Sequence, residues 1–323
     1  MSTPCILVTG VGAIIGQGII KSLRMADRPV RIIGLDRNPH AFGANLCDSF
    51  VSKPENEDNE EYLLFLTSLI KEYDINMIIP GIEHDIFFFD AHRNIFKQSQ
   101  AFLVLNSHEL IEIARDKWET AKILEKAGIQ IIPGIIPSTW QECISKLGPP
   151  PLLLKPRQGN GSRGIVKLYD ERDFEYWVAN NSINFIIQKI VGTDNQEYTA
   201  SVFGFGNGRS TSPIIFKRQL NQNGSTLSAE LVQDSLINIL INRLTKLFKP
   251  IGPTNYQFRK ESEVVYLLEV NPRISSATSF RAAFNYNEAW MCIDYFIHEI
   301  HPNPQPAIKG RATRYTEDWI EYL

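Results

Sequence analysis

The sequence predicts an α/β protein that begins with a parallel sheet covered by helices. Apolar runs typical of buried strands occur at residues 5–9, 30–36, 77–79 and 102–105. Apolar residues at helical spacing lie between them, most clearly over residues 62–73. Strand and helix alternating at this rhythm favour a parallel sheet with helices on both faces.

Composition and charge exclude several classes of function. The chain has 323 residues, a net charge of −3 and a pI of about 6.1, so no nucleic-acid partner is indicated. No apolar run approaches the roughly 20 residues of a membrane span, and the N-terminus lacks the basic region of a signal peptide. The four cysteines are scattered without a C-x-x-C pair, which predicts reduced thiols in a cytoplasmic protein.

A glycine-rich turn after the first strand raises the alternative of an NAD(P)-dependent oxidoreductase. Gly10, Gly12 and Gly16, with Asp36 about twenty residues later, approximate the Rossmann dinucleotide fingerprint, but the spacing of the last two glycines is one residue too long. Such glycines also permit a tight turn and close packing of helix on strand. We favour packing and keep cofactor or substrate binding as the alternative.

Beyond residue 113 the pattern changes. A helix is expected from Asp116 to Gly128, and strands at 152–155 and 164–168 flank a glycine-containing loop. The loop is too long for a two-residue hairpin and lacks core-forming residues, which predicts a mobile flap. Further helices are expected at 172–179, 234–248 and 288–300, and further strands at 185–192, 196–202, 213–218, 255–259 and 264–270.

The end of strand 152–155 has the chemistry of a phosphate site. Lys155 would project its charge into the crevice where ligands of α/β proteins bind. An ammonium group and the free N–H groups of a glycine loop both suit phosphate oxygens. The alternative is an ordinary surface charge at a strand end.

The segment 267–273 has the chemistry of a metal site. Glu269 and Asn271 point to the same face of a strand, because side chains two apart do so, and their oxygens suit Mg²⁺. Glu269 lies in an otherwise apolar strand, and a buried carboxylate needs a cation or several donors. The alternatives are a structural salt bridge for Glu269, a turn cap for Asn271 and an ordinary ion pair for Arg273.

The ordered motifs between residues 115 and 275 resemble those of the ATP-grasp superfamily, in particular the carbamoyl-phosphate synthase large subunit and its single-copy relatives. The resemblance implies a Rossmann-like pre-ATP-grasp domain over residues 1–113 and an ATP-grasp domain over 114–323. Within the second domain it implies a lid-containing subdomain at 114–190 and a metal and substrate subdomain at 191–323.

The resemblance also implies roles for individual residues. The family often has acids where this chain has Gln188 and Gln257. Because the uncharged Gln257 stands at a metal position, a second Mg²⁺ is expected to be held less firmly. The implied ligands are ATP and Mg²⁺, with Mn²⁺ as an alternative ion. The assignments are Lys117, Lys155 and the loop residues Gly159, Gly161, Ser162 and Gly164 for phosphates, Gln188, Lys189 and Ile190 for adenine, Glu197 for ribose, Gln257, Glu269 and Asn271 for metal, and Arg273 with Lys155 for catalysis.

The implied reaction joins a small carboxylate to an amine. ATP would phosphorylate the acid, and the amine would attack the acyl-phosphate, which releases ADP and phosphate without a protein nucleophile. A carbamoyl-phosphate synthase-like activity on bicarbonate and a nucleotide-binding protein without catalysis are the alternatives. The substrate pocket is expected to use Lys217, Arg218 and the segment 275–287, including Arg281. A homo-oligomer is compatible with this reading.

Overall fold

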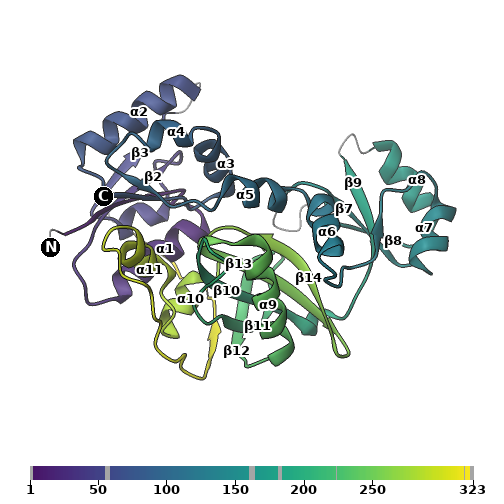
Figure 1. The fold of residues 1–323 in the computed structure, drawn as a ribbon. Coiled ribbons are helices and arrows are strands. Elements are labelled where there is room, and N and C mark those ends of the chain that lie inside the picture. The colour runs from purple at the N-terminus through teal and green to yellow at the C-terminus, as the bar shows by residue number, and fades with distance from the viewer. Residues whose placement is uncertain are drawn as a thin grey trace.

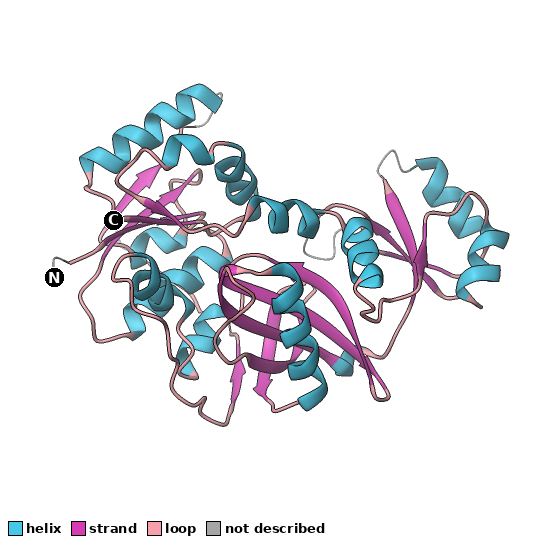
Figure 2. Ribbon diagram, in the orientation of Figure 1, coloured by secondary structure: helices cyan, strands magenta, loops and turns pink. Residues whose placement is uncertain are grey.

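The computed structural model describes residues 3–54, 59–159, 164–180, 184–222, 224–315 and 317–320. It shows an N-terminal α/β unit, a large antiparallel sheet beneath it and a smaller lobe at the far end of an elongated molecule (Figure 1). Helices and strands are interleaved in all three parts (Figure 2).

The N-terminal unit is the parallel sheet that the sequence predicts. Its strands run in the order β3-β2-β1-β4-β5. Ile6 and Val8 share a core with helix α1, whereas Leu7 faces helices α2 and α3, so helices cover both faces. The elements are β1 (Cys5–Thr9), α1 (Ile14–Met25), β2 (Arg31–Asp36), η1 (Phe42–Leu46), β3 (Ser49–Ser52), α2 (Asn59–Glu72), β4 (Met77–Ile79), α3 (Glu83–Ala91), α4 (Arg93–Phe96) and β5 (Phe102–Leu103).

The large sheet is antiparallel and runs in the order β14-β13-β10-β11-β12-β15. One of its faces is apolar and packs on helix α9, with Tyr256, Phe258 and Val270 in the shared core. Its elements are η2 (Asp194–Gln196), β10 (Glu197–Phe205), β11 (Ile214–Leu220), β12 (Thr226–Leu231), α9 (Ser235–Phe248), β13 (Ile251–Glu261), β14 (Val264–Asn271), α10 (Thr278–Ala283), α11 (Glu288–Phe296) and β15 (Arg311–Thr313).

The opposite face of the large sheet changes character along its strands. At one end Phe203 and Phe216 pack in the core that includes residues of α1 and α11. Polar side chains replace them toward the other end, where Glu197 and Arg259 are register partners and Gln257 pairs with Glu269. This polar end of the sheet faces the smaller lobe.

The smaller lobe is a sheet in the order β6-β9-β7-β8. Strands β7 and β8 pair antiparallel, as expected for the predicted hairpin. Helices α7 and α8 close one side, with Trp140 and Phe174 in the core. The elements are β6 (Gly134–Ile135), α7 (Trp140–Leu147), β7 (Leu152–Pro156), β8 (Val166–Leu168), α8 (Glu171–Asn180) and β9 (Phe185–Lys189).

Helices α5 (His108–Arg115) and α6 (Lys117–Lys126) connect the three parts (Figure 1). Leu110 and Leu124 pack in the same core as α9 and the large sheet. The domain boundary predicted between residues 113 and 114 therefore falls inside α5, and the start of the predicted lid-containing subdomain packs on the larger sheet.

Candidate active site

A cleft of about 820 Å³ separates the smaller lobe from the polar end of the large sheet. Strand β7 and the chain beyond it form one wall, and strands β10, β11, β13 and β14 form the other. The cleft brings together residues that lie far apart in sequence. Those predicted as site residues and found in its lining are Lys117, Lys155, Gly159, Lys189, Ile190, Glu197, Gln257 and Glu269.

The start of helix α6 is fixed to the end of β7. The carboxylate of Asp116 caps the helix by accepting from Trp118 N at 2.9 Å and also accepts from Arg157 Nη2 at 2.6 Å. Burial opposes its ionisation, but the hydrogen bonds from Arg157 and from the helix N–H groups lower the pKa of Asp116. Lys117, the next residue, donates its backbone N–H to Arg157 O at 2.9 Å. This anchoring places the Lys117 side chain at the cleft.

Lys155 enters the cleft from β7. Burial, reinforced by the nearby charge of Lys117, lowers its pKa to about 8, while Glu269 opposes that shift. The ammonium group of Lys117 donates to Gly159 O at 2.8 Å and lies 4.0 Å from Glu269 Oε1. Lys117 and Lys155 therefore place two positive charges near Glu269 in the cleft, which is an environment suited to a polyanion bound with a metal ion.

The side chains assigned to metal all carry oxygen donors. Gln257 and Glu269 are register partners on β13 and β14, and both line the cleft. Asn271 continues the same face, is 4% exposed and pairs in register with Asn255. Its buried Nδ2 has no hydrogen-bond partner among the described residues, so the carboxamide is not committed to a structural role through that atom. Oxygen donors of this kind fit Mg²⁺.

Glu197 is held by two arginines. Its Oε1 accepts from Arg218 Nη2 at 2.8 Å, and its Oε2 accepts from Arg259 Nη2 at 2.7 Å. The same Nη2 of Arg218 donates to Gln257 Oε1 at 2.8 Å. Arg218 was expected in the substrate pocket and does line the cleft, whereas Arg259, which also lines it, was not predicted as a site residue. The strand register alone links Arg259 to Glu197, because the two residues are 62 apart in the chain.

The segment predicted to receive adenine lies where the chain leaves β9. Lys189 and Ile190 line the cleft, whereas Gln188 is buried with its side chain against Gly134. Among the loop residues, Gly159 and Gly164 have positive φ angles of 118° and 71°, which suit glycine. Gly161 and Ser162, and with them the centre of the predicted flap, lie outside the described residues.

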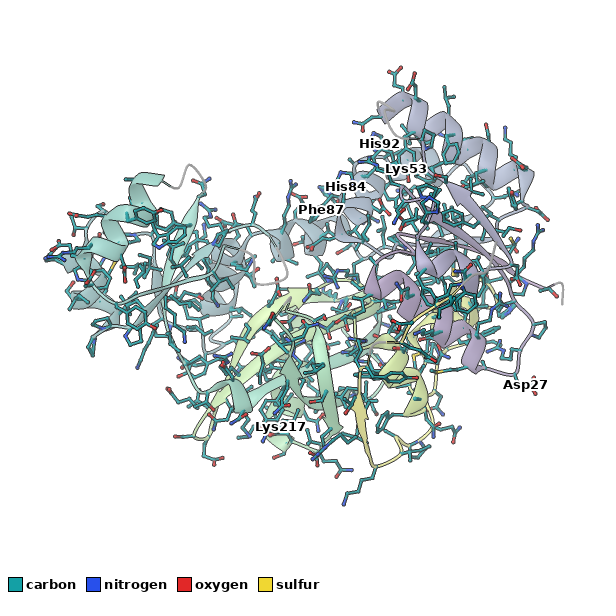
Figure 3. The ribbon with its side chains drawn as sticks, turned by 180° about the vertical axis from the view of Figure 1, so that it is seen from behind. Asp27, Lys53, His84, Phe87, His92 and Lys217 are labelled. Atoms are coloured by element: carbon teal, nitrogen blue, oxygen red, sulfur yellow. The ribbon has the colours of Figure 1, made fainter. Side chains whose placement is uncertain are left out.

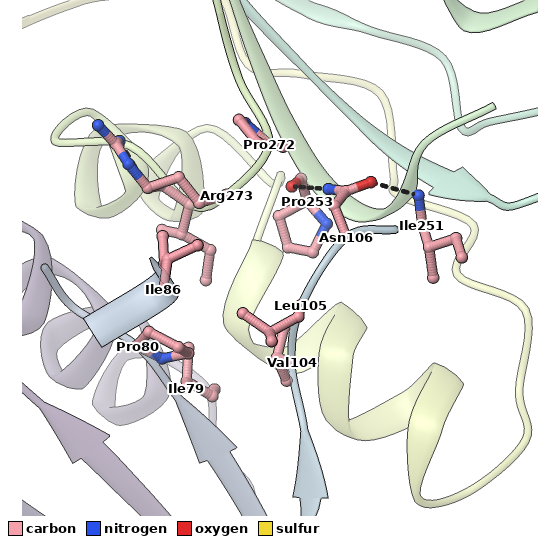
Figure 4. A pocket seen from close by; sticks show the side chains of 11 residues that line it. Ile79, Pro80, Ile86, Val104, Leu105, Asn106, Ile251, Pro253, Pro272 and Arg273 are labelled. Carbon is pink, nitrogen blue, oxygen red and sulfur yellow. Dashed lines mark hydrogen bonds between the residues drawn. The ribbon is translucent and has the colours of Figure 1, made fainter. Parts of the chain in front are cut away.

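Arg273 lies beside the cleft and not in its lining. Its Nη1 donates to Ile274 O at 3.1 Å, and its Nη2 is 3.8 Å from Glu83 Oε2 at the start of α3. Figure 4 shows it at a junction where Asn106 bonds Pro253 and Ile251, with the guanidinium directed away from Asn106. The structure thus places Arg273 between the N-terminal unit and the end of β14.

Two expected substrate residues are elsewhere. Arg281 is fully buried, where it pairs with Glu288 at 3.2 Å and donates to Asn255 Oδ1 at 2.6 Å. This network holds α10 and α11 to the large sheet, so the expectation that Arg281 lines a substrate pocket was wrong. Lys217 is exposed, lies on the face of strand β11 opposite to Arg218, and is not in the cleft lining (Figure 3).

In the glycine turn of the N-terminal unit, the groups that would contact a dinucleotide are used in contacts within the protein. Asp36 Oδ2 accepts from Gly12 N at 2.7 Å, which uses the carboxylate that would hold a ribose in a dinucleotide site. A Cβ on Gly16 would lie 2.3 Å from Gly10 O, so this glycine is needed for helix α1 to approach β1. The contacts support the packing interpretation over the oxidoreductase alternative.

A further group of potential metal ligands consists of Asp90, His108 and Glu112. Asp90 accepts hydrogen bonds from Arg93 and, at 2.8 Å, contacts His108 Nδ1. These contacts already satisfy the Asp90 carboxylate and join α3 to α5.

Within the part of the chain that the structure describes, no helix is both long and apolar enough to span a membrane.

Two family models match the chain. A family model described as an ATP-grasp domain matches residues 114–277. A second, described as a PylC-like N-terminal domain, matches residues 6–104. The carbamoyl phosphate synthase large chain of Pseudothermotoga lettingae is 26% identical over 205 residues, which are 58% of this chain but 18% of that protein. The chain therefore spans less than a fifth of this relative.

Solved structures with the same fold cover nearly the whole chain. An N5-carboxyaminoimidazole synthetase from Staphylococcus aureus in complex with ADP has a TM-score of 0.73 at 17% identity and covers 94% of this chain and 80% of that one. The biotin carboxylase domain of a Hydrogenobacter thermophilus 2-oxoglutarate carboxylase, with MgADP and bicarbonate, has a TM-score of 0.73 at 15% identity, covering 96% and 74%. An L-amino acid ligase from Bacillus licheniformis has a TM-score of 0.68 at 14% identity, covering 95% and 76%.

Proposed function

The chain belongs to the ATP-grasp family, and from that premise we propose an ADP-forming ligase that joins a small carboxylate to an amine. The family accounts for the use of ATP with Mg²⁺. The observation that carries the finer proposal is the set of cations and oxygen donors that line one cleft. The ammonium groups of Lys117 and Lys155 and the oxygens of Gln257 and Glu269 line the same cleft, with Lys117 4.0 Å from Glu269.

The residues of the chain divide the work of the proposed reaction. Lys117 and Lys155 bind the phosphates of ATP and keep the γ-phosphoryl group in line with the acid. Gln257, Glu269 and Asn271 would hold Mg²⁺, which offsets the negative charge of the phosphates. Glu197 lies at the ribose end of the cleft, and Lys189 and Ile190 lie at the adenine end. Arg273 would receive the acyl-phosphate at the junction between the N-terminal unit and the end of β14.

The bonds change in two steps. A carboxylate oxygen of the acid attacks the γ-phosphorus, and the bond to the ADP oxygen breaks. The amine then attacks the acyl carbon, phosphate leaves with the bonding electron pair, and the amine nitrogen loses a proton. The acyl-phosphate must be shielded from water during this sequence, because hydrolysis would waste ATP.

Bicarbonate is the second candidate substrate. It is favoured by the similarity to carbamoyl phosphate synthase large chains and by the fold shared with a carboxylase domain that holds bicarbonate. The shared fold of an L-amino acid ligase favours an organic acid instead.

A cytoplasmic location is proposed because all four cysteines are unpaired.

The proposal is tested by the nucleotide product. Amino acids and small acids are screened for ATP-dependent ADP release, with hydroxylamine present to trap the acyl-phosphate as a hydroxamate. We expect ADP, phosphate and a hydroxamate that depend on one organic acid. AMP and pyrophosphate would contradict the mechanism, and strong stimulation by bicarbonate alone would favour the second candidate. The Glu269→Gln variant supplies the background rate.

A further inference from the structure

We propose that the guanidinium of Arg218 takes the place of a second divalent cation beside Gln257, so that the site works with one metal ion held by Glu269 and Asn271. The inference rests on the proposed function, because it concerns the metal of that same site. It assigns Arg218 a positioning role toward the metal and the phosphates.

A single nitrogen of Arg218 bonds both Gln257, an assigned metal ligand, and the neighbouring carboxylate of Glu197. Its Nη2 donates to Glu197 Oε1 and to Gln257 Oε1, each at 2.8 Å. The side chains of Arg218 and Glu197 are 5% and 7% exposed, so water does not screen the pair effectively. The positive charge is therefore fixed beside the carboxamide oxygen that would otherwise be offered to a metal.

Gln257 is a weak ligand for a second metal ion in this position. It is neutral, and its oxygen already accepts a hydrogen bond from a cation. A divalent ion bound there would lie next to the guanidinium in a setting of low dielectric, where like charges repel strongly. The arginine thus excludes a second metal by charge as well as by occupying the oxygen.

Glu197 offers no alternative anchor for that ion. Its Oε2 is bonded to Arg259 Nη2 at 2.7 Å, so each of its oxygens has an arginine partner. Glu269 differs, because the ion pair recorded for it is the longer one of 4.0 Å from Lys117 Nζ. Of these two cleft carboxylates, Glu269 is the one able to accept a metal without displacing an arginine.

Arg218 also retains donor capacity. Its Nε is buried and has no hydrogen-bond partner among the residues that the structure describes. This Nε is too buried to reach a phosphate, but Arg218 lines the cleft, so its positive charge attracts phosphate oxygens there. The fixed cation would therefore supply, from β11, part of the charge that a second metal would bring with the nucleotide.

The test counts metal ions directly and does not require turnover. The protein is saturated with a non-hydrolysable ATP analogue, and bound Mn²⁺ is measured from the electron paramagnetic resonance signal of the free ion. We expect one Mn²⁺ per chain in the complex, and two would overturn the proposal. Failure of the analogue to bind at all would instead count against the proposed function, so the two failures are distinguishable.

Two double variants provide the decisive comparison. Arg218→Gln with Gln257→Glu removes the cation and supplies a carboxylate, so a second Mn²⁺ is expected. Arg259→Gln with Gln257→Glu is the matched control, because it also removes one arginine partner of Glu197 but retains Arg218. This control should still bind one Mn²⁺ per chain. Equal counts in the two double variants would overturn the assignment.

A single variant keeps the proposal testable if the loss of buried Arg218 prevents folding, which circular dichroism would reveal. In Gln257→Glu the new carboxylate lies beside Arg218 and pairs with it, so the count should stay at one. A second Mn²⁺ in this folded variant would show that Arg218 does not exclude the ion.

Discussion

The Lys117 ammonium group lies 4.0 Å from Glu269 Oε1, although one residue begins helix α6 and the other lies in strand β14. One was assigned to phosphate and the other to metal. In the absence of ligand they offset part of each other's charge. In the proposed site, binding of ATP with its metal would replace this pair by lysine–phosphate and carboxylate–metal contacts, so nucleotide and metal should bind with positive coupling.

Replacement of Lys155 by alanine should weaken ATP binding without unfolding the protein. The variant loses a charge-assisted contact to phosphate, which predicts a loss of about tenfold to a hundredfold in affinity. Isothermal titration calorimetry with ATP and Mg²⁺ measures it. Lys122→Ala is the matched control, because Lys122 is an exposed residue of α6 that pairs with Glu119. Equal affinities in the two variants would contradict the role of Lys155.

ATP affinity should fall as the pH rises above about 8, the value to which the cleft lowers the pKa of Lys155. Phosphate binds the protonated amine, and a nearby anion raises a lysine pKa again. Above that pH the complex must therefore take up a proton that the free protein has lost. Calorimetry at pH 9 in buffers of different ionisation enthalpy detects this uptake. It should disappear in Lys155→Ala, and uptake that persists there must come from another group.

The double variant Glu269→Gln with Asn271→Ala should lose turnover and retain nucleotide binding. The proposed metal acts mainly on the transferring phosphate, whereas the proposed adenine contacts are made by Lys189 and Ile190. We expect turnover below about one hundredth of the wild-type rate. ADP affinity measured without metal should change little. Near-normal Mg²⁺-dependent turnover would remove these residues from the metal site.

Loss of the α6 cap in Asp116→Ala should reduce the free energy of unfolding by about 1–2 kcal/mol at neutral pH. The pKa of Asp116 is lowered in the folded protein, so its contribution is present above the ordinary carboxyl pKa and is lost as the pH falls through the folded value. Urea unfolding at pH 7 and pH 3 should show the gap between variant and wild type closing in acid. Thr139→Ala, which removes the uncharged cap of α7, should give a gap that does not depend on pH.

Replacement of Arg281 by methionine should destabilise the fold by about 3–5 kcal/mol, because Glu288 would be left buried without its partner. Lys217→Met serves as the exposed comparison and should change stability by no more than about 0.5 kcal/mol. Chemical denaturation of both variants measures the difference. If the Arg281 variant were as stable as Lys217→Met, the buried network would not be holding α10 and α11.

Much of the fold was predictable because local patterns agree with the final structure. The parallel N-terminal sheet, the hairpin of β7 and β8 and helix α9 follow from periodicity and turn residues. Helix α3 was missed, since its consecutive apolar residues Ile86, Phe87, Phe88 and Phe89 show no helical period. Strand β12 was missed because it is stabilised by pairing with β11 and β15, which a local pattern does not reveal.

The candidate site was predictable to the extent that single motifs carry chemistry. Lys155 and Glu269 were identified from their own surroundings in the sequence. The pairing of Glu197 with Arg218 and Arg259 depends on the register of three strands, so it required the structure. The position of Arg273 beside Glu83 likewise depends on how the N-terminal unit sits on the sheet.

The core shared by α1 and the large sheet makes the two halves of the chain interdependent. Trp290 Nε1 donates to Leu23 O at 3.0 Å, and Arg28 pairs with Asp294 at 2.6 Å. A fragment ending near residue 113 would expose the apolar side of α1 to solvent and would tend to aggregate. Exchanging N-terminal units between relatives would therefore require α10 and α11 to be transferred with them. The part that must be exchanged as one piece includes elements from both halves of the chain.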